Sequence, residues 1–210
     1  MISVGKEKVV SISQYRHETS GDTHIFFGGL DTLRNPIIAI KGKPESMADL
    51  KWALDELLGV KTAFGAGMVP EYIVLHHSLT NDGQVVDWQA IRRYHKGRGW
   101  RDIGYNYGVE LVGSEYEILR GRMDNEVGAH ALGFNERSLG VCLPGNFDLQ
   151  PPTAAQLEPT RRLTRSLMLI YNIPVAKVIG HRETYALRGV PVEKTCPGKM
   201  FDLDAFRRSL

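Results

Sequence analysis

The sequence predicts an α/β protein that carries a smaller β-rich segment at its N-terminus. From residue 71 onward, short strand patterns alternate with amphipathic helix patterns, which is the signature of an α/β domain. Before residue 65, three strand patterns precede a single helix pattern. Gly65-Ala66-Gly67, followed by Pro70, separates the two parts as a linker would. We therefore expect a β-β-β-α subdomain over residues 1–65 and a second domain over residues 71–210.

The N-terminal segment contains residues typical of strands and of one capped helix. Alternating or continuous apolar residues predict three strands, over 8–15, 23–28 and 36–41. A helix follows, because Ser46 and Asp49 form a capping-box pattern ahead of apolar residues at helical spacing. Gly59 is placed to end this helix.

The strands of the second domain are predicted from short apolar segments bounded by turn residues. They cover residues 71–77, 106–112, 115–119, 138–143 and 175–179. The second and third of these are separated by Gly113-Ser114 and should form a hairpin.

Three helices are expected between and after these strands. Asp87 can cap a helix that ends at Gly97. Thr153 and Gln156 form a capping box before a longer helix, but Pro159 removes a backbone donor in its second turn. That helix should therefore either start near Pro159 or be kinked, and residues 201–208 form a terminal helix.

Composition excludes several classes of protein. The chain has 210 residues, 26 Lys and Arg against 24 Asp and Glu, and a net charge of +2, too balanced for a nucleic-acid-binding protein. Nothing approaches 18 consecutive apolar residues, so no integral membrane segment is expected. The N-terminus lacks the apolar region of a secretory signal, which predicts synthesis in the cytoplasm. Two cysteines do not make a disulfide framework.

Histidine and cysteine residues that follow strands are candidate metal ligands. His76-His77 end one strand, His181 follows another, and Cys196 lies in KTCPG. Imidazole nitrogen and thiolate sulfur favour zinc over magnesium or calcium. Two histidines and one cysteine leave a fourth position open, as in catalytic zinc sites. Since neighbouring strand residues point to opposite faces, one of His76 and His77 should face the metal, and alternation alone does not choose between them.

Five sequence blocks occur in an order that resembles a known family. They are VLHHSLT (74–80), DIGYNYGVE (102–110), GAHALGFNERSLGVCLPGNF (128–147), GHRE (180–183) and KTCPG (194–198). This pattern resembles the zinc-dependent N-acetylmuramoyl-L-alanine amidases of the type 2 amidase and peptidoglycan-recognition-protein family, and in particular its small phage endolysins. The resemblance implies a central mixed β-sheet flanked by helices, with zinc at one sheet edge under a groove.

The resemblance also implies roles for individual residues. His76, His181 and Cys196 would bind zinc, with His77 as a neighbour. Tyr105 and Lys194 would be catalytic, stabilising negative charge on the carbonyl oxygen, and Tyr105 has the alternative role of positioning the attacking water.

Other residues carry weaker expectations. His130 matches a family position beside the substrate groove, so it either contacts substrate or is structural. Tyr107 is the alternative to the catalytic tyrosine. Cys142 should be a buried thiol, His95 should lie on a helix surface or behind the site, and Glu183 is a weak candidate for a general base.

The function implied is hydrolysis of the amide between N-acetylmuramic acid and L-alanine in peptidoglycan by zinc-activated water. The lack of a signal peptide suits an endolysin that reaches the cell wall after the membrane is breached. Bacterial peptidoglycan is the expected partner, without nucleic acid or an obligate protein partner. The alternatives are a cytoplasmic amidase that recycles anhydro-muropeptides, a non-catalytic peptidoglycan-binding module, and a hydrolase that uses Cys196 as nucleophile.

Overall fold

The computed structural model describes residues 2–3, 9–10, 12–16, 23–27, 68–80 and 87–210. The strands are β1 (Ile2–Ser3), β2 (Val9–Val10), β3 (Ile12–Arg16), β4 (Thr23–Phe27), β5 (Tyr72–His77), β6 (Tyr107–Val112), β7 (Glu115–Arg120), β8 (Ser138–Leu143) and β9 (Val178–Gly180). The α-helices are α3 (Trp88–Gly97), α4 (Ala154–Tyr171), α5 (His181–Leu187) and α6 (Leu203–Arg208), with a 3₁₀ turn, η1, over Val175–Lys177.

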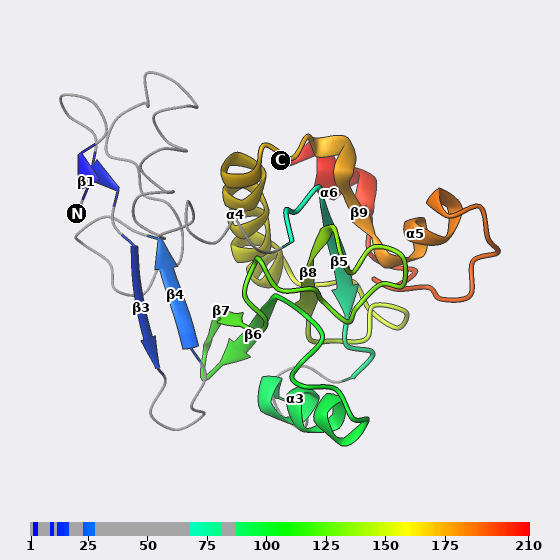
Figure 1. Ribbon diagram of the computed structural model, residues 1–210, viewed down its shortest axis with the longest axis horizontal. Coiled ribbons are helices and arrows are strands. Elements are labelled where there is room, and N and C mark those ends of the chain that lie inside the picture. Colours follow the sequence, from blue (N-terminus) through cyan, green and yellow to red (C-terminus); the bar gives the residue numbers. More distant parts are fainter. Residues whose placement is uncertain (1, 4–8, 11, 17–22, 28–67, 81–86) are drawn as a thin grey trace.

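A mixed sheet forms the centre of the molecule (Figure 1). Its strand order is β3-β4-β7-β6-β8-β5-β9, with β5 parallel to both β8 and β9, and β6 antiparallel to β7. All six residues of β8 are buried, as expected for a central parallel strand covered on both faces. The predicted mixed sheet flanked by helices is therefore confirmed.

The two faces of the sheet pack against different helices. On one face, Leu75 and Val141 share a core cluster with Leu163 of α4, which lies alongside the sheet (Figure 1). Side chains one residue further along each strand point the other way. Cys142, the β8 partner of His76, accordingly packs with Trp88 of α3. The sheet thus places His76 on the α3 face, away from the α4 core.

Most element boundaries in the second domain agree with the sequence prediction. The 138–143 strand and the hairpin are found as β8, β6 and β7. Asp87 caps α3, and its carboxylate accepts a hydrogen bond from the Ala90 amide at 2.6 Å.

Two expectations for the second domain need correction. Helix α4 begins at Ala154, so a start near Pro159 is wrong: the Thr153 hydroxyl accepts from the Gln156 amide at 3.1 Å and sets the first turn, and Pro159 lies inside the helix. The strand expected over 175–179 is divided into η1 and the short β9. Pro174 precedes η1 and accepts from the Lys177 amide at 2.8 Å, which closes a turn where extended backbone was expected.

Two of the N-terminal strands, β3 and β4, extend the same sheet, whereas β1 and β2 form a separate two-stranded sheet. Strand β3 pairs with β4, and β4 meets β7 at His24 and Leu119. The pattern predicted as one strand over 8–15 is divided between β2, which pairs with β1, and β3. The strand over 36–41, the helix after Ser46 and the linker at 65–67 lie outside the described residues. The division into domains at residues 65–71 stays a prediction.

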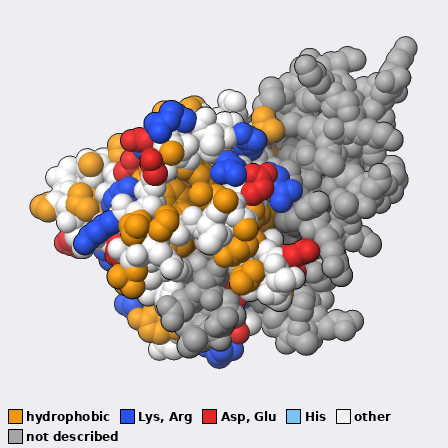
Figure 2. Space-filling view, turned by 180° about the vertical axis from the view of Figure 1, so that it is seen from behind, with side chains coloured by type: hydrophobic (Ala, Val, Ile, Leu, Met, Phe, Trp, Pro, Cys, Tyr) orange, Lys and Arg blue, Asp and Glu red, His pale blue; other side chains and the backbone are white. Residues whose placement is uncertain are grey.

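One face of the molecule carries charges of both signs. On the face seen in Figure 2, basic and acidic side chains are interspersed among apolar ones, with no continuous field of one sign on its described part. Among the residues that the structure describes, no helix combines the length and the apolar character needed to cross a bilayer.

Candidate metal centre

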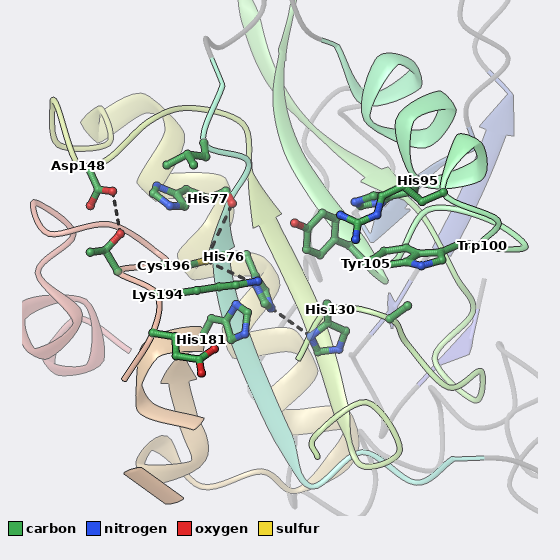
Figure 3. Close-up of a pocket in the computed structure, with 15 residues that line it drawn as sticks. His76, His77, His95, Trp100, Tyr105, His130, Asp148, His181, Lys194 and Cys196 are labelled. Atoms are coloured by element: carbon green, nitrogen blue, oxygen red, sulfur yellow. Dashed lines mark hydrogen bonds between the residues drawn. The ribbon is translucent and has the colours of Figure 1, made fainter. Parts of the chain in front are cut away.

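Three side chains from distant parts of the chain meet at one edge of the sheet. His76 lies near the end of β5, and His181 follows β9 directly as the first residue of α5. Because β5 and β9 are parallel neighbours, their carboxyl ends meet at the same edge. Cys196 lies in the loop before α6. One donor atom from each of these buried residues lies within 4.8 Å of the others (Figure 3).

The structure brings His76, and not His77, into this group. The Nδ1 atom of His76 lies 3.5 Å from Cys196 Sγ, and the His76 ring centroid lies 4.7 Å from that of His181. His77 points to the α4 side, where its Nδ1 accepts a hydrogen bond from the Phe147 amide at 3.1 Å. Strand alternation left open which of the two histidines joins the group. The structure places His76 on the face where the group lies and His77 on the other.

The spacing and protonation of these donors fit a zinc ion. Zn–S and Zn–N bonds of about 2.3 and 2.05 Å at a tetrahedral angle place sulfur and nitrogen about 3.6 Å apart, close to the 3.5 Å between Cys196 and His76. Burial lowers the pKa of His181 to about 4 and holds that of His76 well below its usual value. Both imidazoles are therefore neutral at pH 7, which is the form that binds metals.

The environment of Cys196 favours a metal ligand over a nucleophile. Burial raises the pKa of the Cys196 thiol to about 12. A nucleophilic cysteine requires a lowered pKa, whereas a bound cation would stabilise the thiolate directly. Cys142 is fully buried, and the two cysteines are not joined by a disulfide.

Tyr105 and Lys194 line the same cavity, of about 440 Å³. The Tyr105 ring centroid lies 5.1 Å from that of His76, and Figure 3 shows its hydroxyl turned toward the His76 side. Burial raises the pKa of Tyr105, so the hydroxyl stays protonated and can donate a hydrogen bond. Lys194 is exposed and extends into the cavity from the loop before Cys196. Tyr107, the alternative tyrosine, instead donates to Asp124 at 2.9 Å in the protein interior.

The remaining candidates occupy positions around this cavity. His130 is buried, and its Nδ1 lies 3.0 Å from His76 Nε2. His95 accepts from the Gly104 amide at 3.1 Å, and its ring centroid lies 5.5 Å from that of Tyr105. Glu183 caps α5 through the Gly180 amide at 2.8 Å and pairs with Arg207. Arg207 of α6 donates to both Glu183 carboxylate oxygens, at 2.9 and 3.1 Å, which argues against a role as general base.

Asp148 is a cavity-lining residue that the sequence analysis did not identify. Its carboxylate accepts from the Thr195 hydroxyl at 2.7 Å and from the Lys199 amide at 2.8 Å. These two hydrogen bonds attach the loop that carries Lys194 and Cys196 to Asp148. An isolated aspartate after a strand carries no sequence signal for such a contact, because its partners lie 47 and 51 residues away.

We expect Asp148→Ala to loosen this loop and lower stability by ~1–2 kcal/mol, since two hydrogen bonds to a carboxylate are lost. The Thr195 hydroxyl and the Lys199 amide hold the pKa of Asp148 below its usual value. This stabilisation is therefore present at neutral pH and is lost as pH falls through the folded-state pKa. Urea denaturation measures the effect. Glu158→Ala, which removes a mostly exposed carboxylate on α4, should change stability by less than ~0.5 kcal/mol. Equal losses would contradict the prediction.

The fold and the residues around the cavity indicate the class of protein to which the chain belongs. Two histidines at the carboxyl ends of sheet strands and a cysteine from a loop, facing an open cavity, are typical of hydrolases that use a metal ion. The chain belongs to the N-acetylmuramoyl-L-alanine amidase family (Amidase_2), whose family model matches residues 66–199. This range contains all six residues singled out as ligands, catalytic groups or a substrate contact.

Individual relatives agree with this assignment. The endolysin of Enterobacteria phage T3 is 33% identical over 148 residues, which cover 68% of this chain and 89% of that protein. A human N-acetylmuramoyl-L-alanine amidase is 32% identical over 143 residues, covering 63% of this chain and 23% of that protein. Among solved structures, the amidase LysC from Clostridium intestinale superposes with a TM-score of 0.57 at 33% identity, covering 68% of this chain and 85% of that one.

Proposed function

We propose that the chain is a phage-type endolysin that hydrolyses the amide between N-acetylmuramic acid and L-alanine in peptidoglycan. The observation that carries this proposal is the convergence of His76, His181 and Cys196 beside Tyr105, inside the part of the chain that matches the amidase family. Endolysins that align along most of their own length add support.

We further propose that His76, His181 and Cys196 hold a zinc ion. When bound, zinc supplies Lewis-acid chemistry that activates water and polarises the scissile carbonyl. The protein supplies two neutral imidazoles and a thiol that gives up its proton on binding. Burial of the three side chains restricts their motion, so they are held in place before the metal arrives.

Tyr105 and Lys194 are proposed to stabilise the charge that develops on the carbonyl oxygen. The protonated Tyr105 hydroxyl is a hydrogen-bond donor on one side of the cavity, and the Lys194 ammonium brings positive charge from the loop opposite. A donor aimed at a developing oxyanion typically contributes about 3 kcal/mol to transition-state stabilisation. The exposed position of Lys194 lets it adjust as substrate enters the cavity.

Peptidoglycan is the proposed substrate in its intact, polymeric form. We propose that the protein is made in the host cytoplasm and reaches the wall when the membrane is breached. A recycling amidase would favour soluble fragments instead. Comparing rates on intact sacculi and on soluble anhydro-muropeptides separates the two, and faster turnover of the soluble fragments would overturn the endolysin assignment.

The reaction is tested with purified protein and peptidoglycan. We expect release of stem peptides that carry a free L-alanine amine, loss of this activity in the presence of a strong chelator, and its return on adding zinc. New reducing sugar ends would indicate a glycosidase instead. Activity that persists in chelator but disappears on thiol alkylation would point to Cys196 as nucleophile. Wall binding without turnover in excess zinc would indicate a binding module.

A further inference from the structure

The contacts on the two sides of the His130 ring indicate which of His76 and His130 donates the hydrogen bond between them. On its far side, His130 Nε2 lies 3.4 Å from the backbone carbonyl oxygen of Ser138, and on its near side Nδ1 lies 3.0 Å from His76 Nε2. A carbonyl oxygen only accepts, so the His130 proton belongs on Nε2. The Nδ1 atom of a neutral His130 is then an acceptor.

This arrangement selects one tautomer of His76. If His130 Nδ1 accepts, His76 Nε2 must carry the proton and donate it. The lone pair of His76 is then on Nδ1, the atom that lies 3.5 Å from Cys196 Sγ. Two consecutive hydrogen bonds therefore orient His76: His130 donates to the Ser138 carbonyl and accepts from His76. As a result, the unprotonated nitrogen of His76 faces the candidate metal position.

His130 is held in a slot that is shaped to its ring. A Cβ atom on Gly128 would lie 2.5 Å from His130 Cδ2, and one on Gly140 would lie 2.6 Å from His130 Cγ. Asn135 accepts from the His130 backbone amide at 2.8 Å. Glycines on both sides and a fixed backbone leave the ring little freedom, so its hydrogen bond to His76 is defined by packing.

We propose that His130 is a positioning residue that sets the tautomer and orientation of His76 for metal binding. The proposal rests on the ligand role of His76 put forward above. It differs from the substrate contact implied by the family resemblance, because both ring nitrogens of His130 are engaged by the protein. Groups that orient a ligating histidine in this way typically change metal affinity by about 10–100-fold when removed.

Two substitutions at this position separate the hydrogen bond from packing. His130→Leu removes the acceptor, whereas His130→Asn keeps an acceptor oxygen close to the place of Nδ1. We expect zinc affinity, measured by competition with a chromogenic chelator, to fall about 10–100-fold in His130→Leu and much less in His130→Asn. Gly128→Ala leaves His130 in place but displaces its ring, and should also weaken zinc binding. Thermal unfolding identifies any variant that does not fold.

A second measurement needs neither metal nor substrate. Nitrogen-15 NMR of the metal-free protein reports which His76 nitrogen carries the proton, and we expect Nε2 in the wild type and a mixture of tautomers in His130→Leu. Unchanged zinc affinity with a raised KM in His130→Leu would overturn the proposal in favour of substrate contact. A wild-type protein that binds no zinc would instead refute the metal site itself, and so the two failures are distinguishable.

Discussion

Replacing His181 by alanine is expected to abolish both zinc binding and peptidoglycan hydrolysis. His181 supplies one of the three donors that the described residues bring together, and two donors do not make a stable site for an ion that prefers four ligands. The amidase rate should fall by about 10³-fold or more, equivalent to a loss of about 4 kcal/mol of transition-state stabilisation. Metal analysis of the purified protein and assay of released L-alanine amines measure the two effects.

His77→Ala is the matched control for this experiment. It removes a buried histidine one residue from His76, but one whose ring nitrogen accepts from the Phe147 amide on the other face of the sheet. We expect this variant to lose stability and to retain one zinc ion per chain. Zinc loss in His77→Ala together with retention in His181→Ala would show that the ligand set has been assigned to the wrong residues.

Tyr105→Phe is expected to lower kcat about 10²–10³-fold while zinc content and fold are kept. Only the hydroxyl is removed, so the aromatic packing against His76 and His95 remains. If the hydroxyl stabilises charge in the transition state, kcat and kcat/KM should fall together. A rise in KM at unchanged kcat would contradict this role and indicate a contribution to substrate binding alone.

Tyr107→Phe is the matched control for Tyr105→Phe, since it removes a tyrosine hydroxyl two residues further along the chain. Its hydroxyl donates to Asp124 and accepts from Arg120 in a buried network. The variant should therefore lose about 1 kcal/mol of stability and keep its kcat. A large loss of kcat in Tyr107→Phe, with little in Tyr105→Phe, would exchange the roles of the two tyrosines.

Local sequence signals predicted most secondary structure in the described part of the second domain. The apolar segment at 138–143 and the Asp87 cap produce β8 and α3 because their causes lie within a few neighbouring residues. A start of α4 near Pro159 is wrong because two local signals compete there: Pro159 disfavours the early helix, and the Thr153 cap decides where it begins. The pairing of β4 with β7 had no local signal, because the paired residues are 95 positions apart.

The sequence by itself determined the donor types, the catalytic candidates and the family to which they point. Tertiary structure decided which histidine of the pair joins the group. Alternation along β5 places His76 and His77 on opposite faces of the sheet, but the two faces become different only when α4 packs on one and α3 on the other. Folding also decided which tyrosine faces the cavity, and it placed His130 behind His76 and Asp148 beneath the Cys196 loop. Those contacts depend on distances between residues remote in the chain, which only the packed sheet brings into register.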